Sequence, residues 1–199
     1  MLDELVSAFD VRHISKSKAA FSITKLEWLN GEHIRRLPLH EFHRLAKPFY
    51  HAEFAQWCDI QLTSQVIQPR VTRLTEIPAM THFLLEVPTY DASLFEHSKS
   101  KSSLESSGTI LKQVAELMAN VEDWCEPQIR QLLMGYATEK GYKTGTVMWP
   151  VRVALSGLAM TPGGATEIAA ILKQVEALRR IQAAIQKIGA SIRKTVLLD

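Results

Sequence analysis

The sequence predicts an all-α fold, built as two consecutive helical subdomains. Apolar residues recur at helical spacing through most of the chain, whereas few segments show the strict alternation of a half-buried β-strand. Prolines and glycines fall at the ends of these periodic runs, where helices start and stop. The period of the pattern is too irregular for a solenoid repeat.

Between Leu39 and Leu85, the chain is expected to contain three helices. They are a short amphipathic segment opened by Leu39–Phe42, a run over residues 53–65, and a run from Ile77-Pro78 through residues 83–85. Pro48 follows the first and Pro69 the second, and the residue before a proline is pushed out of the α region. The apolar positions of the second helix are Phe54, Trp57, Cys58, Ile60 and Leu62.

The helices of the second half carry clearer signals. One apolar stripe consists of Ile110, Val114, Leu117 and Met118. Glu126-Pro127 starts the next helix with proline in its first turn, and Gly141 ends it. Trp149-Pro150 is expected in the first turn of a short helix over residues 151–155.

A turn and a long helix follow. Thr161-Pro162-Gly163-Gly164 is typical of a turn, and Thr166-Glu167 is expected to cap a helix that reaches Ile185. Between the two halves, residues 87–107 are rich in serine and charge and poor in periodic apolar residues. We interpret that segment as a hinge or exposed connection.

Composition narrows the class of protein. The 199 residues are 46% hydrophobic and 22% charged, as in an ordinary globular protein. No apolar run approaches the 18 residues of a membrane span, and the acidic start does not resemble a signal peptide. Two distant cysteines favour the reducing cytoplasm over a disulfide framework. A net charge of +2 requires any nucleic-acid site to concentrate its basic residues on one face.

Catalytic and metal sites are not expected. His13 to Ser17 spells HISKS, which shares three letters with the KMSKS loop of class I aminoacyl-tRNA synthetases. That loop needs a preceding nucleotide-binding domain with a HIGH motif, and neither fits before residue 13. The string is better interpreted as a basic surface turn that could touch phosphate. His40-Glu41-Phe42-His43 lacks the HExxH spacing of a zinc site and a third ligand.

Two arginines suggest a binding site. Arg70 follows Pro69, and Arg152 follows Trp149-Pro150 among apolar neighbours, where a long cation needs a partner. The doublets Arg35-Arg36 and Arg179-Arg180 could belong to a binding site, but they fit the solvated faces of helices about as well.

Several stretches resemble one family in the same order. Residues 15–35 (SKSKAAFSITKLEWLNGEHIR), residues 67–78 (IQPRVTRLTEIP), residues 126–163 (ending WPVRVALSGLAMTPG) and LRRI at 178–181 are similar to bacterial glutamyl-tRNA synthetases. The similarity lies in the C-terminal, anticodon-binding part and covers essentially the whole chain. Ser22 and Thr24 stand where that family usually has acidic residues, and the final IGASIRKTVLLD runs past its usual end.

The resemblance implies an organisation and a function. Residues 1–21 would be a remnant of the linker from a missing catalytic half, and residues 22–95 and 96–199 would be two helical anticodon-binding subdomains forming an α-helical cage. The chain would be the tRNA anticodon-recognition module of a glutamate–tRNA ligase, inactive as an enzyme alone. The module itself would need no cofactor, whereas its parent would use ATP and Mg²⁺.

The resemblance also implies site residues. Arg70 would inspect the third anticodon base, while Arg152 and the turn of Thr161, Pro162, Gly163 and Gly164 would form one side of the anticodon pocket. Candidates for contacts with the tRNA backbone are Lys16, Lys18 and Arg35. The expected partner is tRNA(Glu), with tRNA(Gln) as an open alternative, and the expected state is a cytoplasmic monomer. A stand-alone helical module that binds RNA or protein without ligase activity is the alternative.

Overall fold

The structure is a computed structural model that describes residues 2–13 and 20–196 of the chain. The regular elements of these residues are helices, apart from an isolated β-bridge between His97 and Ser102. The all-α prediction is therefore confirmed. The α-helices are α1 (Leu2–Ala8), α2 (Ile23–Arg36), α3 (Leu39–Ala46), α4 (Phe54–Trp57), α5 (Ile60–Ile67), α6 (Ile77–Leu85), α7 (Leu104–Ala119), α8 (Glu126–Glu139), α9 (Thr144–Ser156) and α10 (Ala165–Val196).

Short 3₁₀ turns connect several of these helices. They are η1 (Val11–His13), η2 (Lys47–Phe49), η3 (Leu74–Glu76) and η4 (Ala92–Phe95). In the described part of the chain, no helix is both long and apolar enough to cross a membrane.

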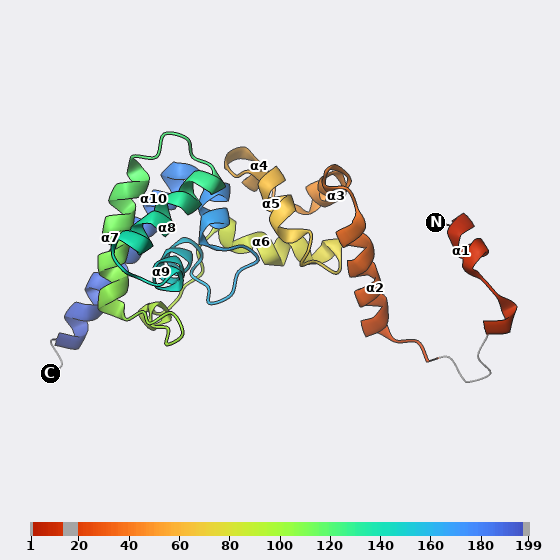
Figure 1. Ribbon diagram of the computed structural model, residues 1–199, viewed down its shortest axis with the longest axis horizontal. Helices are drawn as coiled ribbons and strands as arrows, with labels where there is room; N and C mark the ends of the chain where they lie inside the picture. Colours follow the sequence, from red (N-terminus) through yellow and green to blue (C-terminus); the bar gives the residue numbers. More distant parts are fainter. Residues whose placement is uncertain (1, 14–19, 197–199) are drawn as a thin grey trace.

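The helices lie in successive groups along the long axis of the molecule. In Figure 1, α2 lies on one side of the α3–α6 group, and the bundle of α7–α10 lies on the other. Within that bundle, α10 packs against α7, α8 and α9, and it also reaches α5 in the middle group. One apolar core extends from Ile34 in α2 to Ile188 in α10. The middle group and the bundle therefore share a continuous interior.

The segment between the two groups is less exposed than the sequence suggested. Residues 87–107 contain η4, in which Ala92 and Phe95 are buried in the core. The expectation of an exposed connection is therefore wrong at Ala92 and Phe95, because the short 3₁₀ turn gives them an inward face that the serine-rich composition does not indicate. The interpretation of the segment as a hinge stays a prediction. The proposed boundary between residues 95 and 96 stays a prediction.

Long polar side chains close the ends of helices that lie far away in the sequence. Gln68 donates from Nε2 to the carbonyls of Ile34 and Leu37 at the end of α2, at 3.0 and 2.8 Å. Gln174 donates to the carbonyls of Met118 and Val121 at the end of α7, both at 3.1 Å. The last carbonyls of a helix have no partner inside it, so these amides satisfy groups that would otherwise be left without one.

Arg180 does the same for two helices at once. Its guanidinium is 2% exposed and donates to Phe83 and Leu84 at the end of α6 and to Leu155 at the end of α9, at 2.6 to 2.8 Å. Its Nε donates to the Glu176 carboxylate at 2.6 Å. The sequence offered a solvated surface as one interpretation of Arg179-Arg180, and this is wrong for Arg180.

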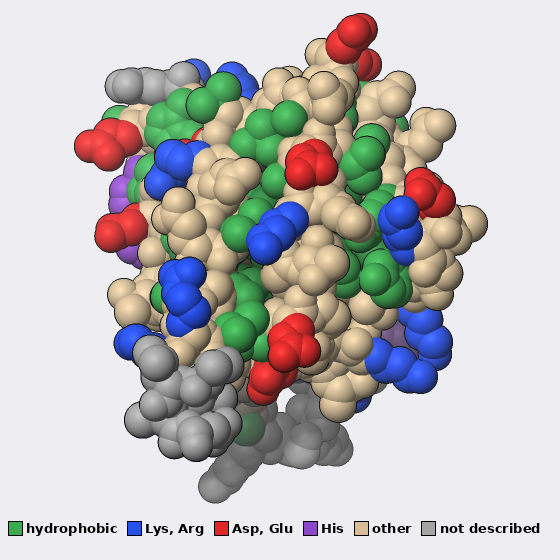
Figure 2. All heavy atoms as spheres, turned by 90° about the vertical axis from the view of Figure 1, so that its left-hand side faces the viewer, with side chains coloured by type: hydrophobic (Ala, Val, Ile, Leu, Met, Phe, Trp, Pro, Cys, Tyr) green, Lys and Arg blue, Asp and Glu red, His purple; other side chains and the backbone are tan. Residues whose placement is uncertain are grey.

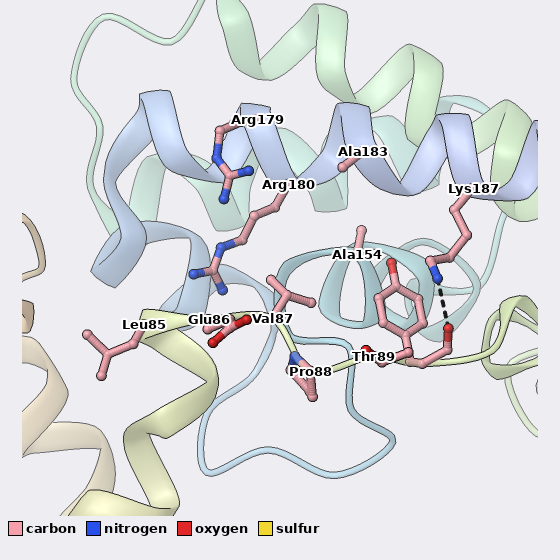
Figure 3. A pocket seen from close by; sticks show the side chains of 11 residues that line it. Leu85, Glu86, Val87, Pro88, Thr89, Ala154, Arg179, Arg180, Ala183 and Lys187 are labelled. Atoms are coloured by element: carbon pink, nitrogen blue, oxygen red, sulfur yellow. Dashed lines mark hydrogen bonds between the residues drawn. The ribbon is translucent and has the colours of Figure 1, made fainter.

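Figure 3 shows how α10 fastens the segment that leaves α6. Lys187 donates to the carbonyl of Tyr90 at 2.8 Å. Gly157 ends α9 with φ of +67°, and a Cβ at this position would lie 2.8 Å from Tyr90 Cδ1. Glycine is therefore needed here both for the left-handed conformation and for the close approach. The pocket of about 380 Å³ in Figure 3 lies between this segment and α10 and is lined by none of the predicted site residues.

The predicted helix over residues 53–65 is two helices. Asp59 interrupts it and caps α5, because its carboxylate accepts a hydrogen bond from the Leu62 N–H at 2.8 Å. The Asp59 N–H donates to the carbonyl of Ile171 in α10 at 3.2 Å. An aspartate before an apolar run is a favoured N-cap. The sequence therefore contained a signal for this break, although the apolar spacing indicated one continuous helix.

The helix that contains Pro150 starts earlier than predicted. α9 begins at Thr144, which places Pro150 inside the helix rather than in its first turn. Val147, Val151 and Leu155 repeat every four residues and are all fully buried. Burial of this stripe favours the extra turn, although a proline inside a helix removes one backbone hydrogen bond.

The long final helix is confirmed, but it bends sharply. Lys173 has φ of 60° and ψ of 166°, which is not a helical conformation, and it divides α10 into two helical parts. The predicted Thr166-Glu167 cap is correct for Glu167 and wrong for Thr166. The Thr166 hydroxyl donates to Glu126 at 2.6 Å, while Glu167 accepts from the N–H of Gly164 at 2.6 Å.

Candidate nucleic-acid interface

The Thr161–Gly164 turn connects α9 with α10 and is held by its own hydrogen bonds. The Thr161 hydroxyl donates to the Gly163 carbonyl at 2.6 Å, and the Gly164 N–H is bound by Glu167. A Cβ on Gly163 would lie 3.1 Å from Cγ1 of Val66 in α5, so the missing side chain lets the turn approach that helix closely. The turn is thus a rigid backbone surface, and Gly164 is its exposed member.

Arg152 projects from α9 and is fixed in two directions. Its Nη2 donates to the Ala159 carbonyl at 2.7 Å, and its Cζ lies 4.7 Å from the centre of the Trp149 ring. Residues three apart on a helix share a face, which brings the two side chains together. Partial burial lowers the pKa of Arg152, but a guanidinium keeps its charge in proteins.

Trp149 is itself anchored. Its indole N–H donates to the carbonyl of Leu94 in η4 at 3.0 Å. The imidazole of His97 lies parallel to the indole, with 3.7 Å between ring centres and 9° between planes. Sequence reasoning missed this stack. The spacing of Trp149 and Arg152 gave a signal for their contact, but nothing local placed His97 on the indole.

Two of the predicted site elements meet in one hollow. Arg152 and Gly164 both line a depression of about 280 Å³, together with Trp149, Met148 and the backbone at Gly145. The hollow combines a cation, an aromatic ring and an exposed glycine. Such a surface can bind an unpaired base through its edge and its face.

Arg70 is linked to the turn through Val66. It lies just after α5 and donates from Nη1 to the carbonyl of Val66, the residue on which Gly163 packs. A guanidinium carries five N–H donors, so one such bond leaves others for a ligand. Arg70 does not line the hollow that Arg152 and Gly164 share.

The predicted backbone contacts are not brought to this place. Arg35 lies in α2, which Figure 1 shows on the far side of α5 and α6 from α9, and its Nη2 donates to Glu32 at 2.6 Å. The hydrogen bond from Arg35 is the main reason why the pKa of the Glu32 carboxyl is lowered. Lys16 and Lys18, with most of the HISKS string, lie outside the described residues.

Charge on the bundle end of the molecule is mixed. Figure 2 shows that face with blue basic and red acidic side chains interspersed among apolar ones, so it carries no single-sign patch. In the described part of the chain, no cluster of three or more His, Cys, Asp or Glu residues could hold a metal ion. His43, one of the histidines considered for a metal site, pairs with the Ser64 hydroxyl at 2.8 Å instead.

The chain is similar in sequence to known glutamate–tRNA ligases. A glutamate–tRNA ligase of Clostridium acetobutylicum is 42% identical over 188 residues, covering 94% of this chain and 39% of that protein. The ligase of Clostridium novyi is 40% identical over 195 residues, covering 96% of this chain and 40% of that protein. The chain therefore spans about two fifths of the length of the curated relatives it matches.

Solved structures support the fold. The crystal structure of a glutamate tRNA ligase from Elizabethkingia meningosepticum, in complex with its amino acid, superposes with a TM-score of 0.76 at 21% identity. The match covers 94% of this chain and 37% of that one. A family model described as an anticodon binding domain matches residues 41–185, which include Arg70, Arg152 and the Thr161–Gly164 turn. On this match, the chain belongs to the anticodon binding domain family.

Proposed function

We propose that the chain is the tRNA anticodon-recognition module of a glutamate–tRNA ligase. The observation that carries the proposal is the hollow in which Arg152 meets Gly164, which belongs to a turn that packs on α5, the helix that Arg70 follows. The high identity to glutamate–tRNA ligases over most of the chain supports it independently.

The chemistry of the hollow suits an unstacked base. Arg152 is pre-oriented by the Ala159 carbonyl and the Trp149 ring, so little freedom is lost when its remaining N–H groups bind a ligand. Those groups are donors only and select acceptors on the base edge. The turn supplies the opposite polarity, because the carbonyl of the exposed Gly164 accepts from the Ile168 N–H at 3.0 Å and still has a second lone pair. Together they can read the first and second anticodon bases.

In the parent enzyme, glutamate would be activated with ATP and Mg²⁺ and transferred to the 3′ end of tRNA(Glu). The residues of this chain would position that tRNA, and Lys16, Lys18 and Arg35 would contact its backbone. We place the module in the cytoplasm as a monomer, which suits its two free cysteines. Whether tRNA(Gln) is also accepted depends on the third anticodon base.

The surface of α2 suggests where the catalytic half would rest. Its exposed apolar side chains are Ile23, Leu26, Trp28 and Leu29, and Phe21 just before it is exposed too. Contiguous exposed apolar residues on a helix mark an interaction surface. We infer that the remaining part of the parent chain covers this face.

The test is to measure the affinity of the 199-residue chain for the anticodon stem-loop of tRNA(Glu) and for one with an unrelated anticodon. We expect tighter binding of the first, and a loss of roughly 5- to 150-fold for Arg152→Ala, as for one good bidentate base contact. Arg44→Ala is the matched control, because this exposed arginine in α3 is paired with Glu41. Equal affinity for both stem-loops, or none, would favour the protein-interaction module instead.

A further inference from the structure

A groove with a volume of about 680 Å³ runs between the end of α7 and the exposed side of α8. Its lining residues on α8 are Gln128, Gln131, Leu132, Gly135, Tyr136 and Glu139. Residues spaced three and four apart share one side of a helix, so this lining follows α8 for about 16 Å, or three turns. The groove has no lining residue in common with the hollow of the candidate nucleic-acid interface.

The floor of the groove is apolar, and the chain itself does not fill it. Leu117 lines it and is 38% exposed, although the other members of the apolar stripe of α7 are fully buried in the core. Leu132 of α8 and Val121 after α7 are half-buried on the same floor. Apolar side chains that line one open groove between two helices are the usual seat of an amphipathic helix from a partner.

Gly135 lies in the interior of α8, where a glycine is unfavourable because its backbone loses the most freedom on folding. The fold does not require a glycine at this position. A Cβ built here would meet no neighbouring helix or side chain of the described residues within 4 Å. The missing side chain instead opens the floor of the groove, and it lets a ligand approach the backbone of α8 closely.

The charged side chains that line the groove are all acidic. They are Glu122 and Asp123 in the loop after α7 and Glu139 near the end of α8, and no lysine, arginine or histidine of the described chain lines it. Lys140 binds Glu139 at 3.0 Å from outside the lining, but both side chains are exposed, so this pair contributes little. Three carboxylates around an apolar floor attract cations and repel phosphates. The groove therefore suits a basic protein segment rather than RNA.

The groove also lies away from the face that we assign to the catalytic half. Figure 1 shows α7 and α8 in the bundle at one end of the molecule, with α2 on the far side of the middle helices. A partner on α8 can therefore bind while the rest of the parent chain covers α2.

We propose that this groove binds an amphipathic helix of a partner protein, with leucine-like side chains on one face and lysines or arginines along the edges of that face. The apolar face fills the space above Gly135 and packs against Leu117. The basic side chains pair with Glu122, Asp123 and Glu139. This partner is additional to the tRNA of the proposed function, and its binding does not depend on that function.

The probe is a fluorescent synthetic peptide of about 14 residues, roughly four helical turns, made of leucine and lysine. Its leucines are spaced three and four apart, so that it forms an amphipathic helix. A second peptide has glutamate in place of every lysine. Fluorescence anisotropy with the 199-residue chain should show binding of the lysine peptide, and at least about tenfold weaker binding of the glutamate peptide.

Two variants test the groove itself. Gly135→Leu fills the floor and should weaken binding of the lysine peptide by about tenfold or more. The triple variant Glu122→Lys, Asp123→Lys, Glu139→Lys should exchange the preference, so that the glutamate peptide binds more tightly than the lysine peptide.

The matched control reverses three exposed carboxylates outside the groove, in the triple variant Glu53→Lys, Glu86→Lys, Glu105→Lys. It changes the net charge by the same amount and should keep the preference for the lysine peptide.

Gly135→Ala separates binding from folding. It should raise the melting temperature by about 2–4 °C, because alanine favours the helix and meets no neighbour here. It should still weaken binding of the lysine peptide, because its methyl group occupies the floor. A fall in melting temperature would show that the fold needs this glycine, and the proposal would lose its basis.

Other outcomes overturn the proposal directly. They are absence of binding by the lysine peptide, unchanged binding by Gly135→Leu, and equal effects of the two triple variants, which would reduce the attraction to net charge. If Gly135→Leu does not fold, the exchange of peptide preference decides alone. The groove variants should bind the tRNA(Glu) anticodon stem-loop as the unchanged chain does, so this proposal and the proposed function can fail separately.

Discussion

We propose that Arg70 serves both structure and base selection. One of its N–H groups closes the end of α5 on the Val66 carbonyl, and the rest of its donor fork is free to meet a base. Cytosine, the third anticodon base of tRNA(Glu), offers acceptors at O2 and N3. Guanine, its counterpart in tRNA(Gln), presents N1–H and N2–H₂, so donor would face donor.

We therefore expect Arg70→Gln to reduce the preference for C over G at the third anticodon base, because an amide both donates and accepts. The measurement compares the affinities of two stem-loops that differ only at this base, with an expected ratio of roughly 5- to 150-fold for the unchanged chain. Arg35→Gln is the control, since loss of a backbone contact would weaken both complexes equally. An unchanged ratio in Arg70→Gln would show that this arginine only ends a helix.

Lys173 has a backbone conformation that suits glycine. With φ of 60° and ψ of 166°, it occupies a region that residues with a Cβ enter only at a cost of about 1–3 kcal/mol. We expect Lys173→Gly to raise the free energy of unfolding by about 1 kcal/mol or more, because relief of strain exceeds the entropic cost of glycine.

Urea denaturation of Lys173→Gly and of Lys112→Gly tests this. Lys112 is an exposed lysine inside α7, where glycine should lower the free energy of unfolding by about 1 kcal/mol. Opposite signs for the same substitution would confirm the strain, and a loss of stability in both variants would contradict it.

At the level of elements, helix ends are connected to one another by buried polar side chains, and Arg180 is the strongest example. We expect Arg180→Gln to lower the free energy of unfolding by about 3–5 kcal/mol, because the carbonyls at the ends of α6 and α9 and the Glu176 carboxylate lose their shared cation.

Its neighbour provides a matched control. Arg179 binds the same Glu176 carboxylate at 2.6 Å, but its side chain is 65% exposed. Arg179→Gln should therefore change the free energy of unfolding by less than about 1 kcal/mol. Thermal or denaturant unfolding of both variants decides the matter, and similar losses in the two would show that the carbonyl contacts contribute little.

The elements also show what the sequence could and could not predict. Signals that act within one turn, such as the proline at the start of α8, placed helix ends correctly. The start of α9 was misplaced because Pro150 favours a first turn locally, whereas the buried stripe through Val147 favours a longer helix. The bend at Lys173 had no local signal, since it depends on contacts that α10 makes with α5 and α7.

The candidate site could also be predicted only in part. The resemblance to synthetases placed Arg152 and the Thr161–Gly164 turn in one pocket, and the structure brings Arg152 and Gly164 into one hollow. The His97–Trp149 stack joins residues 52 positions apart in the chain through tertiary packing alone. Such a contact between distant segments could not be read from spacing or composition.

For the whole molecule, the exposed apolar face of α2 predicts that one substitution affects stability differently in the isolated chain and in the parent ligase. Trp28 is 58% exposed, so Trp28→Ser should change the free energy of unfolding of this chain by less than about 0.5 kcal/mol. In the parent enzyme, where we propose that the face is covered, the same change should lower the melting temperature.

Trp149→Ser is the matched control, since its ring is packed in both contexts and its loss should cost about 3–5 kcal/mol. Equally small effects of Trp28→Ser in the chain and in the parent would mean that no other part of the ligase rests on α2.

The caps supplied by Gln174 and Arg180 also determine when the helix ends are completed during synthesis. During synthesis, α6, α7 and α9 leave the ribosome before the residues that close their carbonyl ends. Translation proceeds at about 5–20 residues per second, so for a period these helices lack the side chains that cap their last carbonyls. The nascent bundle can collapse early, but it gains its final rigidity only when the second part of α10 emerges and binds all three ends.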